Sequence, residues 1–374
     1  MLKIALVTNN PPPYRIPVFE RLGRMPGVNF QAVFCSEREP NRQWDLPPLH
    51  FDHVYLRERY TEVQGRYIHN NPDVIHALKR FLPNVVVTDG FYPTQLYAFG
   101  YALARGIAHV PFTDGTDISE RGLSHVHKLI RRFVFARSRA FLSASDGGDR
   151  LYQGYGILAP KCFQSALCID NAAFTPDTLP NEKQFDFIFC GRIEPTKNPL
   201  FALDVALAAA NKLGRKVNIL FVGSGSLEPQ LKAAAALRPD LAEATFHGFA
   251  RQSELPGLYR SARLFLFPTL YDVWGVVGNE ACAAGLPVLV SPHAGIAGEL
   301  VMNFENGFIC NLDVDLWANR AVLLLTREEL WQHFSRRSLA LVRQYNFDNA
   351  ALGFLNACRF AASVPAPRER MMPV

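Results

Sequence analysis

The fold follows from residues 185–198, which read FDFIFCGRIEPTKN. An apolar run, Phe185–Cys190, stops at a glycine, and a helical apolar period begins at Asn198. A short aromatic-rich run that gives way to a helical period predicts a buried strand followed by a helix. Because strands that alternate with helices form mostly parallel sheets covered on both faces, this unit predicts an α/β protein.

The same alternation extends in both directions from this unit. Before it, the predicted strands are Lys3–Val7, Phe30–Phe34, Asn84–Val87, Ala108–Phe112, Ala140–Ser143 and Phe163–Leu167. After it, they are Val217–Gly223, Ala244–His247, Leu264–Phe267, Pro287–Val290 and Gly307–Cys310. Helical periods separate the strands, and a long helical stretch, Glu328–Ala362, closes the chain.

A proline-containing break divides the alternation in two. Residues 171–184 include Pro176, Asp177, Pro180 and Asn181 and lack an apolar period, so we interpret them as a linker. We therefore predict two doubly wound, Rossmann-like domains that face each other across a cleft, with ligands at the carboxyl ends of the strands. The predicted domains span residues 1–175 and 176–345, and residues 346–374 form a C-terminal helix with a tail.

The composition excludes several classes of protein. Of the 374 residues, 49% are hydrophobic and 20% are charged, which excludes a globally disordered chain. The net charge of +5 is too small and dispersed to predict nucleic-acid binding, but it suits anionic ligands or an anionic membrane surface. The seven cysteines form no CxxC pair, as expected of reduced thiols in a cytosolic protein. Because the chain shows no signal-peptide pattern and no apolar run of about 18–20 residues, we expect a cytoplasmic location.

The first candidate site follows the strand Phe185–Cys190. Arg192 and Lys197 flank the start of the next helix, whose N-terminus is itself partly positive. Two cations at this place suit a diphosphate, and the alternative is a solvated loop with helix-flanking charges. A second loop, Gly223-Ser224-Gly225, either approaches a ligand closely or makes a tight turn with a serine cap.

Residues 268–287 read PTLYDVWGVVGNEACAAGLP and place acids around the start of another helix. That helix begins near Val276 and ends at Gly285, so the amides near residues 275–277 are unpaired donors that can face phosphate. Asp272 precedes the helix, and Glu280 lies inside it. Acidic side chains beside an anion site can accept hydrogen bonds from the hydroxyls of sugars and riboses. Alternatively, Asp272 is an ordinary loop residue and Glu280 a partly buried, paired carboxylate.

Together these motifs resemble the donor domain of retaining GT-B glycosyltransferases, and most closely the family 4 enzymes, also called glycosyl transferases group 1. The resemblance runs in order over residues 185–312. It rests on Gly191–Lys197, Gly223–Gly225, His247–Phe249, Asp272 with Glu280, Ala284–Val288, Ser291–Leu300 and Asn306 with Gly307. The resemblance implies a GT-B fold in which the first domain binds the acceptor and the C-terminal helix crosses back to that domain.

The resemblance also implies a role for each matching residue. Arg192 and Lys197 match the cation pair that neutralises the donor diphosphate, and Glu280 matches the acid that holds the nucleotide ribose. Asp272 takes the place of the first glutamate of the E-x7-E motif, which contacts the donor sugar. The remaining donor-side matches are the backbone amides of Trp274, Gly275 and Val276, the loop at Gly223, and the loop after Gly248, where the base is held.

The first domain offers two further candidates. Residues 9–17 read NNPPPYRIP and lack the G-x-G-x-x-G of nicotinamide dehydrogenases. Many family 4 enzymes have a Gly-Gly pair there whose amides face the donor phosphates, so Arg15 either replaces those amides or belongs to a loop that shapes the acceptor pocket. Asp114 falls where the family often has a histidine-containing loop beside the reacting centre, and the alternative is an Asx-turn.

Residues 125–139 read HVHKLIRRFVFARSR and combine basic with apolar side chains. Such a helix can lie on anionic lipid, and the alternative is a surface helix that packs one apolar face on the sheet. Asp313 and Asp315 resemble a metal-binding DxD, but their place at a predicted helix start favours capping. The histidines show no metal-ligand spacing, so we expect neither a metal nor another cofactor.

The resemblance implies a hexosyltransferase that acts with retention and without a metal ion. It would move a hexosyl group from a nucleotide diphosphate sugar to a saccharide or polyprenyl-linked saccharide acceptor, in cell-surface polysaccharide or glycoconjugate synthesis. Work on a lipid-linked acceptor implies peripheral contact with the inner face of the membrane. One alternative is a nucleotide-sugar epimerase of the same fold, for which only Asp114 offers an additional acid or base. Another is a non-catalytic nucleotide-sugar-binding module, which the set of Arg192, Lys197 and Glu280 disfavours.

Overall fold

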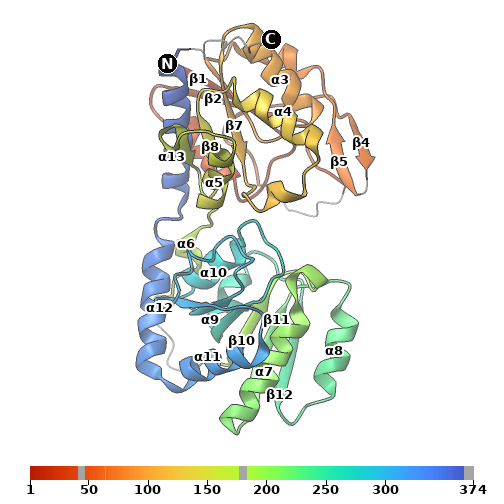
Figure 1. The fold of residues 1–374 in the computed structure, drawn as a ribbon, viewed down its shortest axis with the longest axis vertical. Helices are drawn as coiled ribbons and strands as arrows, with labels where there is room; N and C mark the ends of the chain where they lie inside the picture. The colour runs from red at the N-terminus through yellow and green to blue at the C-terminus, as the bar shows by residue number, and fades with distance from the viewer. Residues whose placement is uncertain (41–46, 64, 177–182, 366–374) are drawn as a thin grey trace. The chain divides into compact units, whose positions relative to one another are not determined.

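The computed structural model describes residues 1–40, 47–63, 65–176 and 183–365. The chain divides into two compact units. Unit 1 consists of residues 1–167 and 347–374, and unit 2 consists of residues 168–346. Each unit is built on a parallel sheet with helices on both faces (Figure 1). The predicted α/β class with two doubly wound sheets is therefore confirmed.

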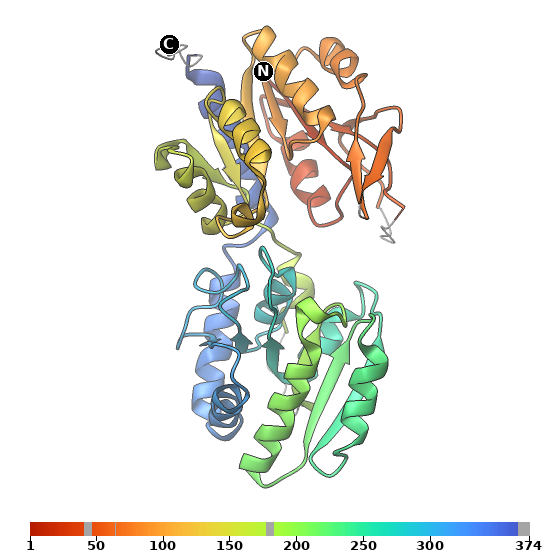
Figure 2. The same cartoon turned by 45° about the vertical axis from the view of Figure 1, so that its right-hand side comes forward.

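Unit 1 contains a seven-stranded parallel sheet in the order β3-β2-β1-β6-β7-β8-β9. Its strands are β1 (Leu2–Thr8), β2 (Val28–Phe34), β3 (Asp52–Tyr55), β6 (Val85–Thr88), β7 (Ala108–Thr113), β8 (Phe141–Ser143) and β9 (Cys162–Gln164). Its helices are α1 (Ile16–Arg24), α2 (Val74–Phe81), α3 (Pro93–Ala104), α4 (His125–Phe135), α5 (Asp146–Gly154) and α13 (Phe347–Ser363). An antiparallel hairpin of β4 (Tyr60–Val63) and β5 (Arg66–His69) lies at the periphery of unit 1 in both ribbon views (Figures 1 and 2).

The two faces of the first sheet bury different helices. Val7 and Val33 belong to the core that α2 and α3 form on one face. On the other face, the ring of Phe354 in α13 lies edge-on to the rings of Phe30 and Phe112. The apolar side of the last helix therefore completes the core of unit 1. This confirms that the C-terminal helix returns to the first domain.

Unit 2 contains a six-stranded parallel sheet in the order β12-β11-β10-β13-β14-β15. Its strands are β10 (Phe185–Cys190), β11 (Val217–Val222), β12 (Ala242–Gly248), β13 (Ala262–Phe267), β14 (Val288–Val290) and β15 (Gly307–Ile309). Its helices are α6 (Asn171–Phe174), α7 (Pro199–Leu213), α8 (Glu228–Ala236), α9 (Leu255–Arg260), α10 (Val276–Ala283), α11 (Val314–Thr326) and α12 (Glu328–Val342). Because the strands alternate their side chains, Phe187 faces the core of α7 and α11, whereas Phe265 meets Tyr259 of α9.

The structure contains strands that were not predicted, where the sequence is polar. The strands β3, β4 and β5 lie outside the predicted ones because they consist mainly of partly exposed residues without a buried apolar run. Residues 343–346 separate α12 from α13 within the predicted helical stretch 328–362, and α13 lies in the segment 346–374 that is predicted to form the C-terminal helix. The predicted linker contains α6, and its residues 177–182 lie outside the described residues. In the part of the chain that the structure describes, no helix has the length and hydropathy needed to cross a membrane.

Candidate active site

The predicted donor residues of unit 2 gather at one edge of its sheet. The loop with Arg192 and Lys197 follows β10, and the loop with Asp272 follows the neighbouring strand β13. Because the strands are parallel, their carboxyl ends meet, and the Lys197 Nζ lies 2.5 Å from the Asp272 Oδ2. Both side chains are mostly buried, with 17% and 19% of their surface exposed. The structure therefore joins two predicted site residues in an ion pair.

The loop after β10 is fixed by the glycine-rich loop after β11. The Gly191 amide donates to the Val222 carbonyl at 2.9 Å, and the Ile193 amide donates to the Ser224 carbonyl at 2.9 Å. Gly223 has a φ of +130°, and a Cβ atom on it would lie 1.9 Å from the Gly191 oxygen. Gly223 therefore has a packing role, because only glycine allows the two loops to approach this closely.

A carboxylate locks the same two loops together. Glu194 accepts hydrogen bonds from the Ser226 amide at 2.8 Å and from the Ser226 hydroxyl at 2.6 Å. These hydrogen bonds lower the pKa of the Glu194 carboxyl, and the nearby Arg192 guanidinium adds to the effect. Arg192 itself is exposed and makes no ion pair within the described ranges. It is therefore the cation of this loop that is available to an anion.

The start of α10 presents backbone donors at the same edge. Gly275 precedes the helix with a φ of +103°, and a Cβ atom on it would lie 2.4 Å from the Phe267 ring. Among the described residues, no acceptor is found for the amides of Gly275, Val276 and Val277, which are the open donors of the first turn. Gly275 and Val276 therefore offer open amides at this edge, and their contact with a donor stays a prediction.

Trp274 differs from the prediction. Its amide donates to the Asp272 Oδ1 at 3.2 Å, so this donor is already used within the loop. Its side chain is buried, and the indole Nε1 donates to the Asn279 Oδ1 at 2.8 Å. The short aspartate side chain reaches back to an amide two residues later, as in an Asx-turn. Trp274 therefore supports the loop from the interior rather than offering a free amide.

Glu280 lies inside α10 and is almost fully buried, with 6% of its surface exposed. Its Oε2 accepts a hydrogen bond from the Tyr259 hydroxyl at 2.9 Å. Burial raises the pKa of the Glu280 carboxyl to about 7, although the hydrogen bonds from Tyr259 and Gln252 oppose the shift. The structure thus agrees with the alternative of a buried, paired carboxylate. Sequence reasoning missed Tyr259, since no local pattern links it to Glu280.

Gly248 ends β12, two strands away from β10 in the sheet. Its carbonyl accepts a hydrogen bond from the Gly223 amide at 2.7 Å, so both glycines lie at the edge that carries Arg192. The next residue, Phe249, exposes 76% of its surface. This large exposed aromatic side chain beside the strand ends is a surface on which a flat base can stack.

Arg15 and Asp114 lie together at strand ends of unit 1. The Arg15 Nη2 lies 2.7 Å from the Asp114 Oδ1, and the Nη1 donates to the Ser165 carbonyl at 2.7 Å. Arg15 is buried, with 3% of its surface exposed, so the structure agrees with a loop-shaping role rather than an open phosphate contact. The turn at Asp114 is made by the Thr113 hydroxyl, which accepts from the Gly115 amide at 3.0 Å. Asp114 instead pairs with Arg15 and remains partly exposed.

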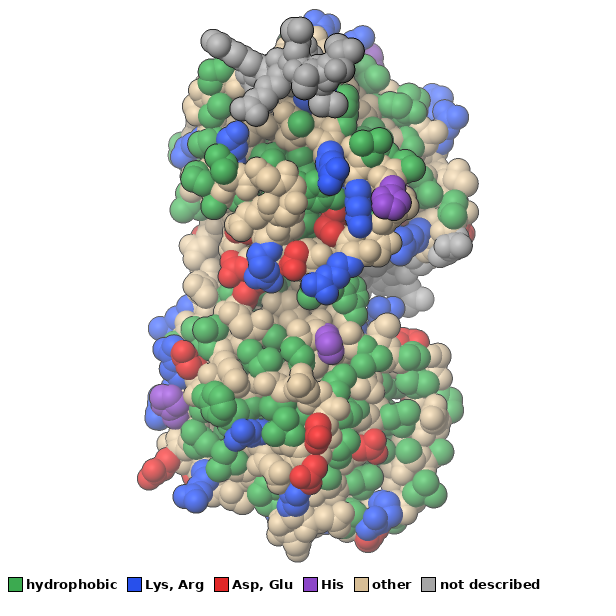
Figure 3. Space-filling view, in the orientation of Figure 1, with side chains coloured by type: hydrophobic (Ala, Val, Ile, Leu, Met, Phe, Trp, Pro, Cys, Tyr) green, Lys and Arg blue, Asp and Glu red, His purple; other side chains and the backbone are tan. Residues whose placement is uncertain are grey.

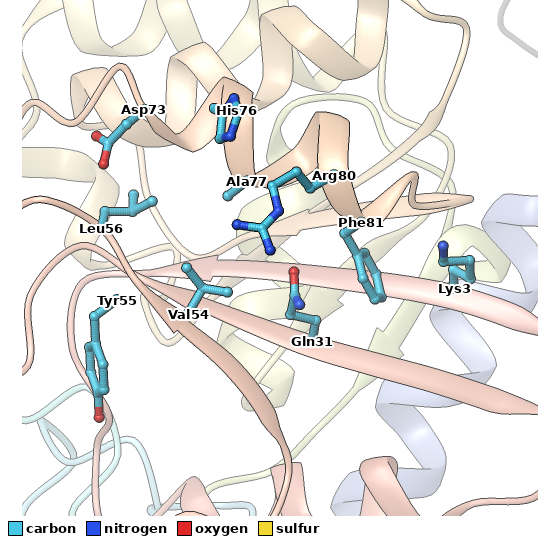
Figure 4. Close-up of a pocket in the computed structure, with 10 residues that line it drawn as sticks. All are labelled: Lys3, Gln31, Val54, Tyr55, Leu56, Asp73, His76, Ala77, Arg80 and Phe81. Atoms are coloured by element: carbon cyan, nitrogen blue, oxygen red, sulfur yellow. The ribbon is translucent and has the colours of Figure 1, made fainter.

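Two further features of the described residues bear on ligands. Asp313 accepts from the Leu316 amide at 2.9 Å, which confirms it as the N-cap of α11. Outside the gaps in the description, no three His, Cys, Asp or Glu side chains gather in a way that could hold a metal ion. A surface cavity of about 280 Å³ lies in unit 1 between α2 and the strands β1 to β3. Figure 4 shows Arg80 of α2 reaching over Gln31 in this cavity, which contains none of the predicted site residues.

Residues 170–339 match the family model described as "Glycosyl transferases group 1". The chain is 30% identical over 173 residues to the D-inositol 3-phosphate glycosyltransferase of Mycolicibacterium smegmatis, a match that covers 43% of this chain and 39% of that protein. It is 30% identical over 227 residues to the amylovoran biosynthesis glycosyltransferase AmsK of Erwinia amylovora, covering 56% and 53% of the two chains. The chain thus spans between about two fifths and one half of the length of these relatives.

The similarity to solved structures covers nearly the whole chain. The structure of Anabaena Alr3699/HepE in complex with UDP has a TM-score of 0.75 at 14% identity, over 96% of this chain and 100% of that chain. The sucrose-phosphate synthase of Thermosynechococcus elongatus has a TM-score of 0.68 at 17% identity, over 97% and 100%. These likenesses establish the GT-B fold. Residues 170–339 of this chain are therefore similar to the glycosyl transferases group 1 family, and a GT-B fold extends over both units.

Proposed function

We propose that this protein is a retaining hexosyltransferase that uses a nucleotide diphosphate sugar. The acceptor is a saccharide or a polyprenyl-linked saccharide, and the reaction belongs to cell-surface polysaccharide or glycoconjugate synthesis at the cytoplasmic face of the membrane. The observation that carries the proposal is the convergence of Arg192, Lys197 and the open amides at the start of α10 on one edge of the second sheet.

In this proposal, the cations and amides stabilise the leaving group. Negative charge develops on the diphosphate as the glycosidic bond breaks, and fixed donors aimed at that charge lower the barrier. Arg192 meets the diphosphate directly, and Lys197 is positioned by Asp272. These side chains supply the positive charge that a metal ion would otherwise bring. One phosphate oxygen then accepts the proton of the attacking hydroxyl on the same face of the sugar, which gives retention.

The acids are proposed to bind hydroxyl groups. Asp272 lies against Lys197 and the start of α10, where the hexosyl group attached to a bound diphosphate would come, and its oxygens can accept from sugar hydroxyls. Glu280 would hold the ribose, since a carboxylate accepts from both ribose hydroxyls. Gly248 and Phe249 would border the base. Because similar solved structures contain UDP, uridine diphosphate sugars are the first donors to test.

Product analysis separates this function from its alternatives. The protein is incubated with uridine, guanosine and adenosine diphosphate hexoses, with and without oligosaccharide acceptors, and nucleotide and sugar products are resolved by chromatography. We expect release of free nucleotide with formation of an α-linked product from an α-linked donor. Interconversion of sugar isomers without acceptor would instead show an epimerase. Measurable nucleotide affinity with neither event would show a binding module.

A further inference from the structure

Helix α4 carries apolar side chains on two sides. Phe135 is buried and lies edge-on to the rings of Phe141 and Tyr152 in the core of unit 1. On the solvent side, Val126, Leu129 and Phe133 expose 66%, 67% and 49% of their surface. Because these three residues are spaced by three and four positions, they form one stripe along the helix. Of the three, Phe133 also lies edge-on to the ring of Phe99 in the core, with 6.0 Å between the ring centroids. A helix that only covers a sheet needs a single apolar side, so the fold leaves the exposed side chains of Val126 and Leu129 unexplained.

Cations flank this stripe. Within the described ranges, Arg121, Lys128 and Arg132 make no ion pair, and residues 125–139 contain no acid. The Arg137 guanidinium lies 4.0 Å from the centre of the Phe133 ring. Figure 3 shows Lys and Arg side chains among hydrophobic ones over this region of unit 1. The surface therefore combines exposed apolar side chains with unneutralised positive charge.

We propose that the solvent side of α4 docks onto an anionic bilayer. Leu129 and Phe133 enter the boundary between headgroups and acyl chains, and Lys128 and Arg132 contact the lipid phosphates. Surface helices bind membranes through this combination of apolar area and electrostatic attraction. A second copy of the chain fits less well, since a two-fold contact would bring the same cations face to face. The docking helix lies on unit 1, so this proposal does not depend on donor binding by unit 2.

Vesicle flotation tests the proposal with the full chain. We expect the protein to float with phosphatidylcholine vesicles that contain about 30% phosphatidylglycerol and to stay behind with phosphatidylcholine alone. Binding should fall steeply between about 0.1 M and about 0.5 M NaCl, because salt screens the attraction. Two double variants, Leu129→Ser with Phe133→Ser and Lys128→Glu with Arg132→Glu, should each lower the partition coefficient at least about tenfold.

Matched variants control for general surface and charge effects. Leu158→Ser removes another exposed apolar side chain of unit 1, where 68% of the residue surface is exposed. Lys79→Glu with Arg80→Glu makes the same charge change on α2, whose basic residues are also exposed. Both control proteins should bind vesicles like the wild type. The melting temperatures of the charge variants should be unchanged, because their substituted side chains are at the surface. Leu129→Ser with Phe133→Ser also loses the contact of Phe133 with Phe99 and should melt at a lower temperature, so the charge variant is the one that separates membrane binding from folding.

Four results would overturn the proposal. The first is that the wild-type protein does not float with anionic vesicles, and the second is that it binds neutral vesicles equally well. The third is that the α4 variants bind like the wild type, and the fourth is that the control variants lose binding to the same extent. Two assays without lipid identify other occupants of the surface. Dimers in sedimentation velocity that Leu129→Ser with Phe133→Ser abolishes would identify a second copy. Binding to polyglutamate but not to vesicles would identify an acidic protein.

Discussion

The ion pair of Lys197 and Asp272 joins two loops that are 75 residues apart in the sequence. It gives the lysine a fixed position before any ligand binds, and it leaves Arg192 as the exposed cation of the loop. An anion that enters this edge of the sheet therefore meets one ready cation and one that is oriented by a carboxylate. Such preorganisation is what stabilises charge in a transition state at little reorganisation cost.

Substitutions in this pair test its role. Lys197→Ala removes the oriented cation and leaves Asp272 unpaired, so we expect turnover to fall at least about tenfold, with a stability loss of about 1 kcal/mol. Asp272→Asn should also lower turnover, whereas Asp272→Glu keeps the charge and should retain more activity than Asp272→Asn. Nucleotide release measures turnover, and urea unfolding measures stability. A wild-type rate in Lys197→Ala would contradict the assignment.

The burial of Glu280 predicts a pH dependence of stability. Its pKa is raised from the ordinary value to about 7, so the folded state holds this proton between about pH 4.5 and about pH 7 while the unfolded state releases it. The free energy of unfolding should therefore decrease as pH rises through that window, by an amount on the order of 3 kcal/mol from this group.

Comparison with Glu280→Gln isolates this contribution. The glutamine is neutral at every pH, so the difference in unfolding free energy between wild type and variant should change between about pH 5 and about pH 7.5. Urea titrations at both pH values give the difference. A difference that is the same at both pH values would mean that Glu280 ionises normally in the folded protein.

The residues of the candidate site could be named from the sequence, but most of their contacts in the fold could not. Arg192, Lys197, Asp272 and Glu280 stand out because they occupy loops and helix starts after apolar runs. The ion pair of Arg15 with Asp114 spans 99 positions, and the bond from Tyr259 to Glu280 links two helices. Long-range pairs of this kind depend on strand order, which no single motif contains.

At the scale of elements, the site is held by loops that pack on each other through glycine. Gly223→Ala places a methyl group against the Gly191 oxygen, so the loop with Arg192 must move. Gly214→Ala is the matched control, because Gly214 also has a positive φ but open space around its Cβ position. We expect Gly223→Ala to lower the free energy of unfolding by about 2 kcal/mol more than Gly214→Ala. Gly223→Ala should also lose donor binding. Equal losses in chemical denaturation would show that the contact tolerates a side chain.

The buried strands could be predicted because an apolar run of strand length is compatible with few other structures. The strands β10 and β13 consist almost wholly of buried residues. The edge strand β3 and the β4–β5 hairpin have no such run, since most of their residues are partly exposed. The boundary between α12 and α13 contains neither proline nor glycine, but Asn346, a favoured N-cap residue, precedes α13, in agreement with the C-terminal helix predicted within residues 346–374.

At the scale of the whole molecule, the chain forms two units, and its last helix joins the first one. The segment that matches the glycosyl transferases group 1 family lies entirely within unit 2, and so do the proposed donor residues. The docking helix α4 lies on unit 1. The proposed donor binding and the proposed membrane binding therefore belong to different units, and each can be tested without the other.

The most direct test of the central claim is calorimetric titration of nucleoside diphosphates. Wild-type protein, Arg192→Ala and the control Arg238→Ala, which changes an arginine paired with Asp240 in the same unit, are titrated with UDP, GDP and ADP and with the corresponding nucleosides. For the diphosphate that binds best, we expect Arg192→Ala to weaken binding at least about tenfold while Arg238→Ala binds like the wild type and nucleoside affinity is unchanged. Wild-type affinity of Arg192→Ala for that diphosphate would contradict the assignment of this edge as the diphosphate site.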